Sequence, residues 1–327
     1  MSSVVLAIVD LAPNVVERLG SQGIDVVLVS DHGGRAAGVA AHPDARAVVT
    51  SGTMGLPAAE IGQLPALEII CTVGAGYEGV DLDVARARGI VVTNSAGTNA
   101  NAVADHAMAL VMALASQIVP YHAIVTRGAW PELNPRNRAN GDPDPAAGLP
   151  AKRQVSGARL GVLGMGIIGR KIADRGANGF GMEVAYHNRQ PRDDAPYRWM
   201  ESLEALARWA DFLVCAAPGG SGTRHLVNRD VLAALGPSSY VVNIGRGSVV
   251  DTGALIDALE NGTVAGAGID VVEGEPNVPE RLRASSRVVL TPHFAGRSAE
   301  SVGASQELVI SNLSAWFRGQ PVRNRVT

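Results

Sequence analysis

The sequence predicts an α/β protein with two doubly wound, Rossmann-like domains of parallel strands. Its 327 residues are more than one hydrophobic core usually organises. Short apolar, β-branched runs alternate with longer segments rich in Ala, Leu and Arg, which is the pattern of buried parallel strands joined by helices. The alternation occurs in two series, and a glycine-rich turn follows the first run of the second series.

Each series contains enough short apolar runs for one sheet. The first series predicts strands at Val4–Val9, Val26–Val29, Ala47–Thr50, Ile69–Val73 and Ile90–Thr93. The second series predicts strands at Arg159–Leu163, Met182–His187, Asp211–Ala216, Tyr240–Ile244, Gly266–Asp270 and Val288–Thr291.

Two different segments separate the series. The stretch from Asn101 to about Val125 predicts one long helix. The segment Trp130–Pro150 contains five prolines and therefore cannot form a regular element. A loop of this length is either functional or a flexible linker. At the other end of the chain, Ala299–Arg318 predicts an amphipathic helix.

The composition excludes several classes of protein. Lys and Arg number 28 against 31 Asp and Glu, so the net charge of −3 argues against a nucleic-acid binder. The longest apolar run, Ala107–Ala115, is too short to span a membrane, and the N-terminus lacks the charge of a secretory signal. Cys71 and Cys215 form no Cys-x-x-Cys pair, so we expect core thiols and no metal site. We expect a cytoplasmic protein.

Known motifs for other chemistries are also missing from the sequence. The only lysines are Lys152 and Lys171, and neither belongs to a Gly-Lys-Ser/Thr phosphate loop. There is no His-Glu-x-x-His metalloprotease motif and no Gly-x-Ser-x-Gly nucleophile elbow. The chemistry must therefore come from other residues.

A dinucleotide fingerprint lies at the start of the second series. Gly164 is suited to a tight turn, Gly166 lets the backbone approach a pyrophosphate, and Gly169 allows helix and strand to pack closely. The helix N-terminus that follows binds phosphates through its free N–H groups and dipole. An ordinary glycine-rich turn is the alternative, but the position between strand and helix favours a cofactor site. The loop residues expected at the cofactor are Gly164, Met165, Gly166, Ile167, Ile168 and Gly169.

The end of the next strand indicates which dinucleotide binds. An NAD site usually has Asp or Glu there, bound to the ribose 2′-hydroxyl. Glu183 stands at the wrong end of its strand, whereas Asn188 and Arg189 stand at the proper end, with Arg192 beyond. A guanidinium suits a 2′-phosphate, so the sequence favours NADP(H) over NAD(H). The alternative is that Arg189 is a solvated loop residue.

Three chemically active residues follow later strands of the second series: Arg246, Glu275 and His293. Residues just past the carboxyl ends of parallel strands face the ligand crevice. For the same reason we expect Ala217, Pro218 and Ile244 to face the cofactor. Taken singly, the arginine could pair with a surface acid, the glutamate could be a solvated turn residue, and the histidine could cap a strand.

The order of these motifs resembles the D-isomer-specific 2-hydroxyacid dehydrogenases, most closely the glyoxylate/hydroxypyruvate reductase and hydroxyphenylpyruvate reductase branch. The resemblance covers nearly the whole chain. It is carried by the glycine fingerprint and by Thr72–Tyr77, Gly245–Gly247, Asp270–Pro276 and Pro292-His293.

The resemblance implies a role for each motif. Arg246 would bind the substrate, His293 would be the acid/base and Glu275 its partner. Asp270 would contact the nicotinamide carboxamide. The residues expected to line the substrate site are Val73, Gly74, Ala75, Gly76, Arg246 and His293.

It also implies a domain organisation and an activity. Residues 1–100 and 299–327 would form a discontinuous, flavodoxin-like substrate-binding domain, and residues 101–298 the dinucleotide-binding domain, with an interdomain cleft. The protein would be a homodimer through its cofactor domains. It would reduce a small 2-keto acid of the glyoxylate or hydroxypyruvate type to the D-2-hydroxy acid.

The residue types fit this reaction on their own chemistry. A guanidinium grips a carboxylate through two N–H bonds. The developing alkoxide needs a proton donor while a nicotinamide delivers hydride. A histidine beside a carboxylate favours the imidazolium form and can donate that proton. Backbone N–H groups at Gly74–Gly76 could bind the other carboxylate oxygen, because small residues leave them uncovered.

Two features depart from the family pattern. The Pro131–Pro150 segment looks longer than usual and is a candidate lid or subunit contact, and Phe294 stands where a smaller aliphatic residue is common. Two alternatives stay open: a non-catalytic, dinucleotide-sensing protein like the related transcriptional corepressors, and a formate or phosphite dehydrogenase. Among the remaining histidines, His106 in an Ala-rich helix is expected to be structural.

Overall fold

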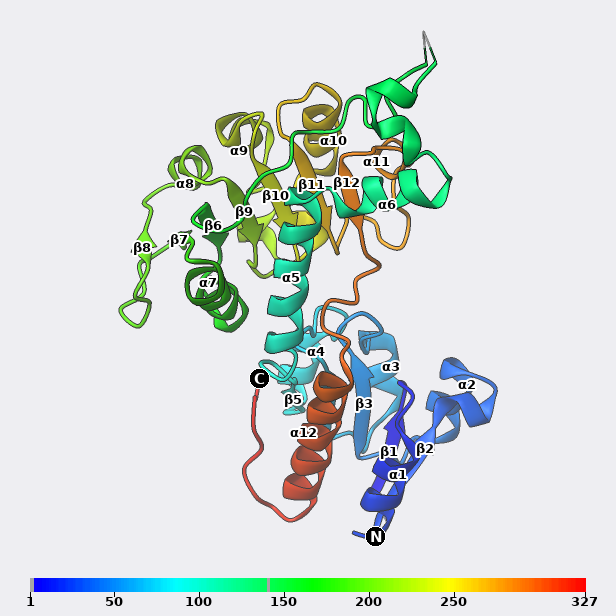
Figure 1. The fold of residues 1–327 in the computed structure, drawn as a ribbon. Helices are drawn as coiled ribbons and strands as arrows, with labels where there is room; N and C mark the ends of the chain where they lie inside the picture. Colours follow the sequence, from blue (N-terminus) through cyan, green and yellow to red (C-terminus); the bar gives the residue numbers. More distant parts are fainter. Residues whose placement is uncertain (1–2, 140–141) are drawn as a thin grey trace. The chain divides into compact units, whose positions relative to one another are not determined.

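A computed structural model describes residues 3–139 and 142–327 of the chain (Figure 1). It divides into two compact units, which are considered separately. Unit 1 consists of Met1–Ala100 and Gly296–Thr327, and unit 2 of Asn101–Ala295. The predicted boundary at which the chain returns to the first domain lies between residues 298 and 299. In the structure it lies between Ala295 and Gly296.

Unit 1 is a doubly wound sheet of five parallel strands in the order β2-β1-β3-β4-β5. This is the flavodoxin-like order. Except for the partly buried edge strand Ile24–Leu28, the strands are almost continuously buried because helices cover both faces. The strands are β1 (Ser3–Ala7), β2 (Ile24–Leu28), β3 (Ala47–Ser51), β4 (Ile69–Val73) and β5 (Val91–Thr93). The helices are α1 (Pro13–Gly20), η1 (Val29–His32), α2 (Arg35–Ala41), α3 (Ala58–Gln63), α4 (Leu82–Ala87) and α12 (Ala299–Phe317).

Helix α12 completes unit 1 although it lies at the end of the chain. Ser298 begins it with a capping box, in which its side chain and that of Ser301 satisfy each other's backbone N–H groups. Its buried face contributes Val309, Ile310 and Leu313 to the core that also contains residues of α1 and β4. The predicted amphipathic helix is confirmed.

Unit 2 is a sheet of seven parallel strands in the order β12-β11-β10-β9-β6-β7-β8. The strand order reverses between β6 and β9, and ligands of such sheets bind at this switch point. The strands are β6 (Arg159–Leu163), β7 (Glu183–His187), β8 (Arg198–Trp199), β9 (Phe212–Cys215), β10 (Tyr240–Asn243), β11 (Gly266–Ile269) and β12 (Val288–Leu290). The sequence did not predict the two-residue β8.

Helices and short 3-10 turns connect these strands. They are α5 (Ala100–Ala115), α6 (Ile118–Thr126), η2 (Pro131–Leu133), η3 (Pro135–Asn137), α7 (Ile167–Phe180), α8 (Leu203–Trp209), η4 (Ser221–Thr223), α9 (Arg229–Leu235), η5 (Gly247–Val249), α10 (Thr252–Glu260) and α11 (Glu280–Arg283).

The prediction of one helix from Asn101 to about Val125 was wrong. The helix breaks at Gln117, which has a left-handed φ of 55°, and α5 and α6 meet at an angle of 62°. Pro120 explains the break: in a continuous helix its ring would collide with the carbonyl of Ser116, whereas a proline is tolerated in the first turn of α6. Among the described residues no single helix is long and apolar enough to cross a membrane, and α5 and α6 reach that length only as a bent pair.

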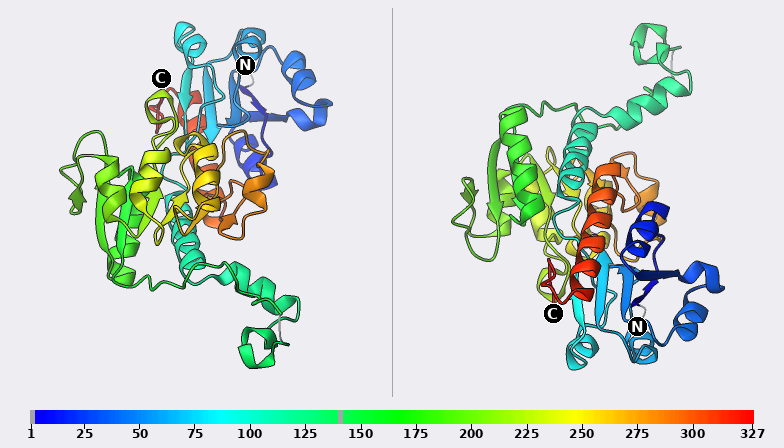
Figure 2. Two further views of the ribbon diagram at one scale, coloured as in Figure 1. Left: turned by 90° about the horizontal axis from the view of Figure 1, so that it is seen from above. Right: turned by 90° about the horizontal axis from the view of Figure 1, so that it is seen from below.

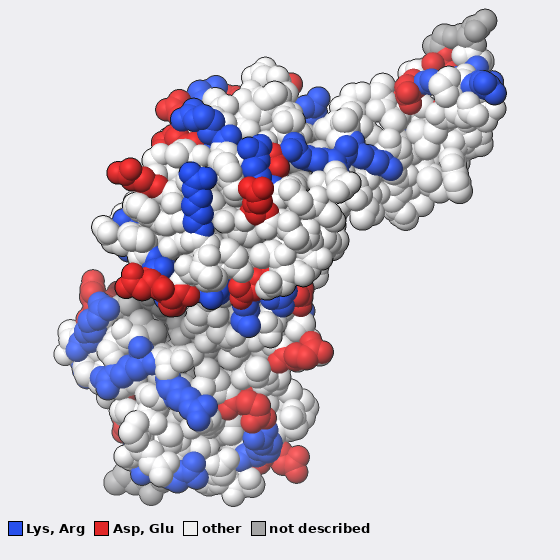
Figure 3. Space-filling model, turned by 60° about the vertical axis from the view of Figure 1, so that its left-hand side comes forward, with Lys and Arg blue, Asp and Glu red and all other residues white. Residues whose placement is uncertain are grey.

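Helix α6 and the segment after it form an arm that projects from the rest of unit 2 (Figures 1 and 2). Between Trp130 and Pro150 the arm holds only the short turns η2 and η3, as its prolines predict, and Asn140 and Gly141 lie outside the described residues. Apolar side chains of the arm are exposed, namely Ile118, Val119, Val125 and Trp130. On the face shown in Figure 3 the arm carries few charged side chains along most of its length.

Both cysteines are free thiols inside the strands, as expected. Burial raises the pKa of the Cys71 thiol to about 11 and that of the Cys215 thiol to about 12. Neither thiol therefore carries the thiolate that a nucleophile or metal ligand needs.

A buried carboxylate between two partly exposed arginines fixes the amino ends of β6 and β9. The Asp211 carboxylate lies 2.9 Å from Arg159 and 2.7 Å from Arg153, and it accepts the Arg159 backbone N–H at 2.9 Å. Burial alone would raise the pKa of Asp211, but the hydrogen bonds from Arg159 and the charge of Arg153 hold it below its ordinary value.

The contacts of Asp211 with the two arginines make the free energy of unfolding depend on pH. Because the pKa of Asp211 is lower in the folded protein, its stabilisation is present above the ordinary pKa of an aspartate, about 4, and is lost as the pH falls below that value through the lower pKa of the folded state. Asp211→Asn should lower the free energy of unfolding by about 2 kcal/mol at pH 7. Urea unfolding of both proteins at pH 7 and pH 3.5 checks this. An equal difference between the two proteins at both pH values would contradict it.

Candidate functional site

The glycine turn of unit 2 lies at the switch point between β6 and β9. Gly164 has a φ of +99°, and a Cβ atom there would lie 2.7 Å from the backbone nitrogen of Ala217. A Cβ on Gly169 would lie 2.0 Å from the carbonyl oxygen of Gly164, so strand and helix touch through glycine. A Cβ on Gly166 would meet no atom within 4 Å. The turn is closed on its inner side and open at Gly166.

The open side of the turn suits the pyrophosphate of a dinucleotide. Helix α7 begins at Ile167, and its N-cap Gly166 has no side chain to occupy the first N–H groups of the helix. These N–H groups and the helix dipole attract anions. Ile167 has a large apolar side chain that is nevertheless 60% exposed. The residues present therefore fit the predicted cofactor.

The carboxyl end of β7 supports this turn and adds a cation. The Asn188 side chain accepts the Met165 N–H at 2.7 Å, so it fixes the glycine turn itself. Arg189 is the next residue and is exposed. Arg192 pairs with Asp194 at 2.8 Å, which leaves Arg189 as the better placed of the two arginines for a ribose phosphate. Glu183 begins β7 at the opposite end, as predicted.

Three further expected cofactor residues line the same edge of the sheet. Ala217 and Ile244 follow β9 and β10 and are buried. The Pro218 carbonyl accepts the Thr223 hydroxyl at 2.7 Å, which anchors the loop after β9. These residues can offer backbone and apolar surface to a ligand.

Arg246 is held by the loop that follows β10. The Asn243 side chain donates to the Arg246 carbonyl at 3.1 Å and accepts the Gly245 N–H at 3.2 Å. A Cβ on Gly219 would lie 3.0 Å from Cγ of Arg246, so the aliphatic part of the arginine side chain packs against the backbone of Gly219. A Cβ on Gly247 would lie 2.2 Å from the carbonyl carbon of Val272. The arginine loop therefore rests directly on the loop after β11.

His293 and Glu275 form a hydrogen-bonded pair. Nδ1 of the histidine lies 2.5 Å from Oε1 of the glutamate, and the side chains are 42% and 35% exposed. A carboxylate only accepts, so Nδ1 carries the proton and Nε2 is directed away from the glutamate. His293 has a left-handed φ of 51°, and its N–H donates to the carbonyls of Asp270 and Thr291.

Strand pairing brings the three predicted residues to one edge. Strands β10, β11 and β12 are parallel neighbours, with Asn243 opposite Ile269 and Ile269 opposite Leu290. The loops carrying Arg246, Glu275 and His293 follow these positions directly, so all three lie at the carboxyl edge of one sheet.

Asp270 supports this edge from inside. Its side chain is only 1% exposed. The carboxylate accepts the Thr291 hydroxyl at 2.6 Å and the N–H groups of Phe294 and Ala295 at 3.1 Å each. In this structure it binds the turn of His293, where the resemblance implied a contact with the cofactor carboxamide.

The predicted substrate loop of unit 1 follows β4, with Gly74 at a φ of +86°. Its three carbonyls, from Gly74 to Gly76, all point into the unit. They accept hydrogen bonds from the Ser95 N–H (2.7 Å), the Asn94 amide (2.9 Å) and the Thr72 hydroxyl (3.0 Å).

The N–H groups of this loop point the other way. In a planar trans peptide, the carbonyl of one residue and the N–H of the next have opposite directions. The N–H groups of Ala75, Gly76 and Tyr77 are therefore directed outward, and such a run forms a small anion-binding concavity. The Gly74 N–H is not part of it, because it donates to the Ser305 hydroxyl at 3.3 Å.

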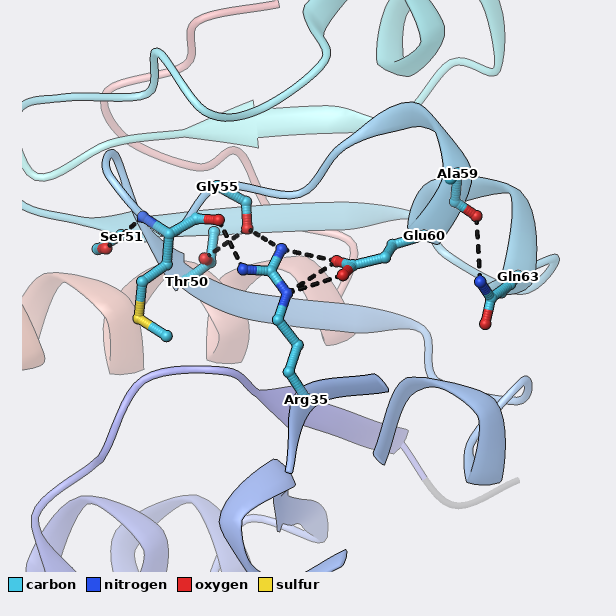
Figure 4. Close-up of polar contacts among 8 residues, drawn as sticks. Arg35, Thr50, Ser51, Gly55, Ala59, Glu60 and Gln63 are labelled. Atoms are coloured by element: carbon cyan, nitrogen blue, oxygen red, sulfur yellow. Dashed lines mark hydrogen bonds and ion pairs between the residues drawn. The ribbon is translucent and has the colours of Figure 1, made fainter. Parts of the chain in front are cut away.

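A second loop, Ser51–Gly55, supports the first. A Cβ on Gly52 would lie 2.5 Å from the carbonyl carbon of Gly76, so the loops touch through glycine. Arg35 on α2 fixes this second loop (Figure 4): it donates to the carbonyls of Met54 (2.6 Å) and Gly55 (3.0 Å). Its Nε and Nη2 also bind the Glu60 carboxylate, at distances from 2.6 to 3.0 Å.

The sequence did not indicate these supporting residues. Arg35 and Glu60 lie 25 positions apart on two helices, with no motif to join them. His106, expected to be structural, lies with Nε2 3.0 Å from the Thr291 hydroxyl. His187 binds the Met200 carbonyl through Nδ1 at 2.8 Å. No group of three or more His, Cys, Asp or Glu side chains suited to a metal occurs among the described residues.

The chain is similar to known proteins over most of its length. A family model described as the NAD binding domain of D-isomer specific 2-hydroxyacid dehydrogenases matches residues 108–295. The chain is 38% identical to the 2-ketogluconate reductase of Gluconobacter oxydans over 84% of each protein. It is 37% identical to the hydroxyphenylpyruvate reductase of Plectranthus scutellarioides, over 85% of this chain and 84% of that protein.

Solved structures show the same architecture. One is the NADPH-dependent glyoxylate/hydroxypyruvate reductase of Sinorhizobium meliloti in complex with NADP and malonate. It has 35% sequence identity and a TM-score of 0.84, over 100% of this chain and 97% of that one.

Proposed function

Because the chain belongs to the D-isomer specific 2-hydroxyacid dehydrogenase family, we propose that it reduces a small 2-keto acid of the glyoxylate or hydroxypyruvate type to the D-2-hydroxy acid with NAD(P)H. The observation that carries the proposal is the exposed His293–Glu275 pair on the sheet edge that also carries Arg246. This edge presents a cation for the keto acid and a proton donor for its carbonyl oxygen.

The cofactor supplies hydride when it is bound. The open glycine turn and the N-terminus of α7 hold its pyrophosphate in this proposal, and Ala217, Pro218 and Ile244 border it. The protein's own residues then bind and orient the keto acid and supply the proton.

Arg246 binds the substrate carboxylate and polarises the keto oxygen through its planar set of N–H donors. As the oxygen gains negative charge, Nε2–H of the His293 imidazolium donates its proton to it. The histidine is left neutral, with its remaining proton on Nδ1 and held by Glu275. In the oxidative direction the same nitrogen accepts the hydroxyl proton.

Glu275 has two effects on this transfer. It fixes the ring through the 2.5 Å hydrogen bond, and it holds the proton of Nδ1, so that Nε2 is the nitrogen that exchanges a proton with the substrate. For unit 1, we propose that the outward N–H groups of the loop Val73–Gly76 and of Tyr77 bind a carboxylate oxygen.

The preferred cofactor in this proposal is NADPH, because Arg189 is exposed just beyond β7 and no acidic residue stands there. Arg189→Asp should lower the ratio of kcat/KM with NADPH to kcat/KM with NADH by at least about thirtyfold, since a charge pair is replaced by repulsion. Initial rates with each cofactor check this. Arg192→Ala is the matched control, because Arg192 pairs with Asp194. An unchanged ratio in Arg189→Asp would contradict the assignment.

The direct test of the function follows NADPH and NADH oxidation with glyoxylate, hydroxypyruvate and 4-hydroxyphenylpyruvate in parallel. We expect turnover with at least one of the three and a D-configured product. Tight cofactor binding without turnover of any of them would favour a dinucleotide sensor. Reduction of NAD(P) by formate or phosphite instead would move the protein to the formate or phosphite dehydrogenases.

We also propose that the protein is a homodimer through unit 2, supported by the exposed apolar side chains of the arm. Replacing Ile118 and Trp130 by Asp should convert a particle of twice the chain mass of 33.8 kDa into a monomer in sedimentation equilibrium. Val302→Asp, an exposed apolar position on α12, is the control. A wild-type monomer would overturn the proposal.

A cytoplasmic location is proposed as well, because reducing compartments preserve free thiols.

A further inference from the structure

The turn Pro292–Ala295 is tied to helix α5 by a chain of hydrogen bonds. His106 on α5 places Nε2 3.0 Å from the Thr291 hydroxyl. That hydroxyl lies 2.6 Å from Oδ1 of Asp270, and the same carboxylate accepts two backbone N–H groups of the turn at 3.1 Å. All members of the chain belong to unit 2.

The direction of each hydrogen bond in this chain is fixed by chemistry. The Asp270 carboxylate only accepts, so the single proton of the Thr291 hydroxyl points to it. The hydroxyl oxygen is then an acceptor, and His106 must donate to it through Nε2–H. A side chain that cannot donate at this point would leave the hydroxyl bound to Asp270 but would remove the donor to its oxygen.

The same histidine makes a second contact with the turn. Its ring meets the ring of Phe294 edge to face, with centroids 5.4 Å apart and an angle of 71° between the planes. The His106 side chain is only 19% exposed. His293, with its left-handed φ of 51°, directly precedes the two residues whose N–H groups are held. Such a conformation persists only where the surroundings fix it firmly.

We propose that His106 is a positioning residue for the reaction: its Nε2–H, acting through Thr291 and Asp270, holds the turn that aims His293. The inference rests on the proposed function for its effect on turnover. Its structural part, the order of the turn, is independent of the substrate. Among the described residues no hydrogen bond or ion pair joins His106 to His293 or Glu275, so it acts through the turn and through Asp270, whose Oδ1 lies 3.7 Å from its Nε2.

Two substitutions at His106 separate its two contacts. His106→Gln keeps an N–H donor near the position of Nε2 and loses the ring. His106→Phe keeps a ring against Phe294 and loses the donor. We expect kcat to fall by at least about tenfold in His106→Phe and to stay within about threefold in His106→Gln, with KM for the keto acid changed less than kcat in both.

A double-mutant cycle tests the chain itself. Thr291→Val removes the hydroxyl between His106 and Asp270, and we expect a loss of kcat of at least about tenfold. If the histidine acts through that hydroxyl, His106→Phe should add less than about twofold in the Thr291→Val background. Full additivity of the two effects would show that His106 acts by another route.

Hydrogen–deuterium exchange gives a readout that needs no substrate. The peptide covering residues 288–297 should exchange at least about tenfold faster in His106→Phe and Thr291→Val than in wild type and His106→Gln. His32→Phe, at an exposed histidine of unit 1, is the control, and thermal unfolding shows that each variant is folded. Wild-type exchange and wild-type kcat in His106→Phe would overturn the inference. Faster exchange in a protein that reduces no 2-keto acid would overturn the proposed function and leave the positioning role in place.

Discussion

Replacing His293 by Ala is expected to lower kcat for keto acid reduction by about 10³-fold, with a smaller change in KM. The hydride can still be delivered without the histidine, but the developing alkoxide then takes its proton from water. A loss of this size corresponds to about 4 kcal/mol of transition-state stabilisation. The substitution also removes the imidazole that is hydrogen-bonded to Glu275. Free imidazole can take the place of the missing ring, so adding it should restore part of the rate.

The measurement is a full kinetic profile with the best keto acid at saturating cofactor. Fluorescence titration with the cofactor should give wild-type affinity, because the glycine turn is remote from β12 in the order of the sheet. His32→Ala removes an exposed histidine of unit 1 and serves as the control. Near-normal turnover in His293→Ala would show that another group donates the proton.

Replacing Arg246 by Gln is expected to lower kcat/KM for the keto acid by about 10³-fold, the second large effect. Both parameters should change, since the guanidinium binds the carboxylate in the ground state and polarises the carbonyl in the transition state. Truncating one member of a buried charge pair costs about 2–5 kcal/mol, which agrees with this figure.

Arg246→Lys separates charge from geometry. Lysine keeps the charge but cannot make two parallel N–H bonds to one carboxylate. We expect it to recover less than about a tenth of the wild-type kcat/KM. Arg229→Gln is the matched control, because that arginine is 71% exposed and pairs with Asp257 outside the site. Full activity of Arg246→Lys would limit the role of Arg246 to its charge.

Much of the fold was predictable because its signals are local. Near-continuous apolar runs predicted eleven strands, all of those in the described sheets except β8, with small shifts at their ends. A strand buried on both faces can be recognised from its own sequence. The two-residue β8 had no such run. The break at Gln117 could have been predicted, because Pro120 stood in the sequence.

The site was predictable where a motif carries it. Gly164, Gly166 and Gly169 each had a physical reason for being glycine, and strand ends placed Arg246, Glu275 and His293 on one edge. What supports these residues was not predictable. The Gly74 N–H donates to Ser305, a residue 231 positions away, and the buried Asp270 side chain is contacted by the residues after β12 and by His106 on α5. Such partners are set by tertiary structure and leave no trace in local spacing.

The inward carbonyls of Gly74–Gly76 limit which substitutions can change the substrate range of such an enzyme. The donors directed outward from this loop belong to the main chain, so no side-chain substitution removes them directly. A carboxylate held in this way would be insulated from mutation, while the side chains of Ala75 and Tyr77 remain free to vary. Directed evolution of substrate range should therefore accept changes at these two positions and reject changes at Asn94 and Thr72, which keep the loop facing the right way.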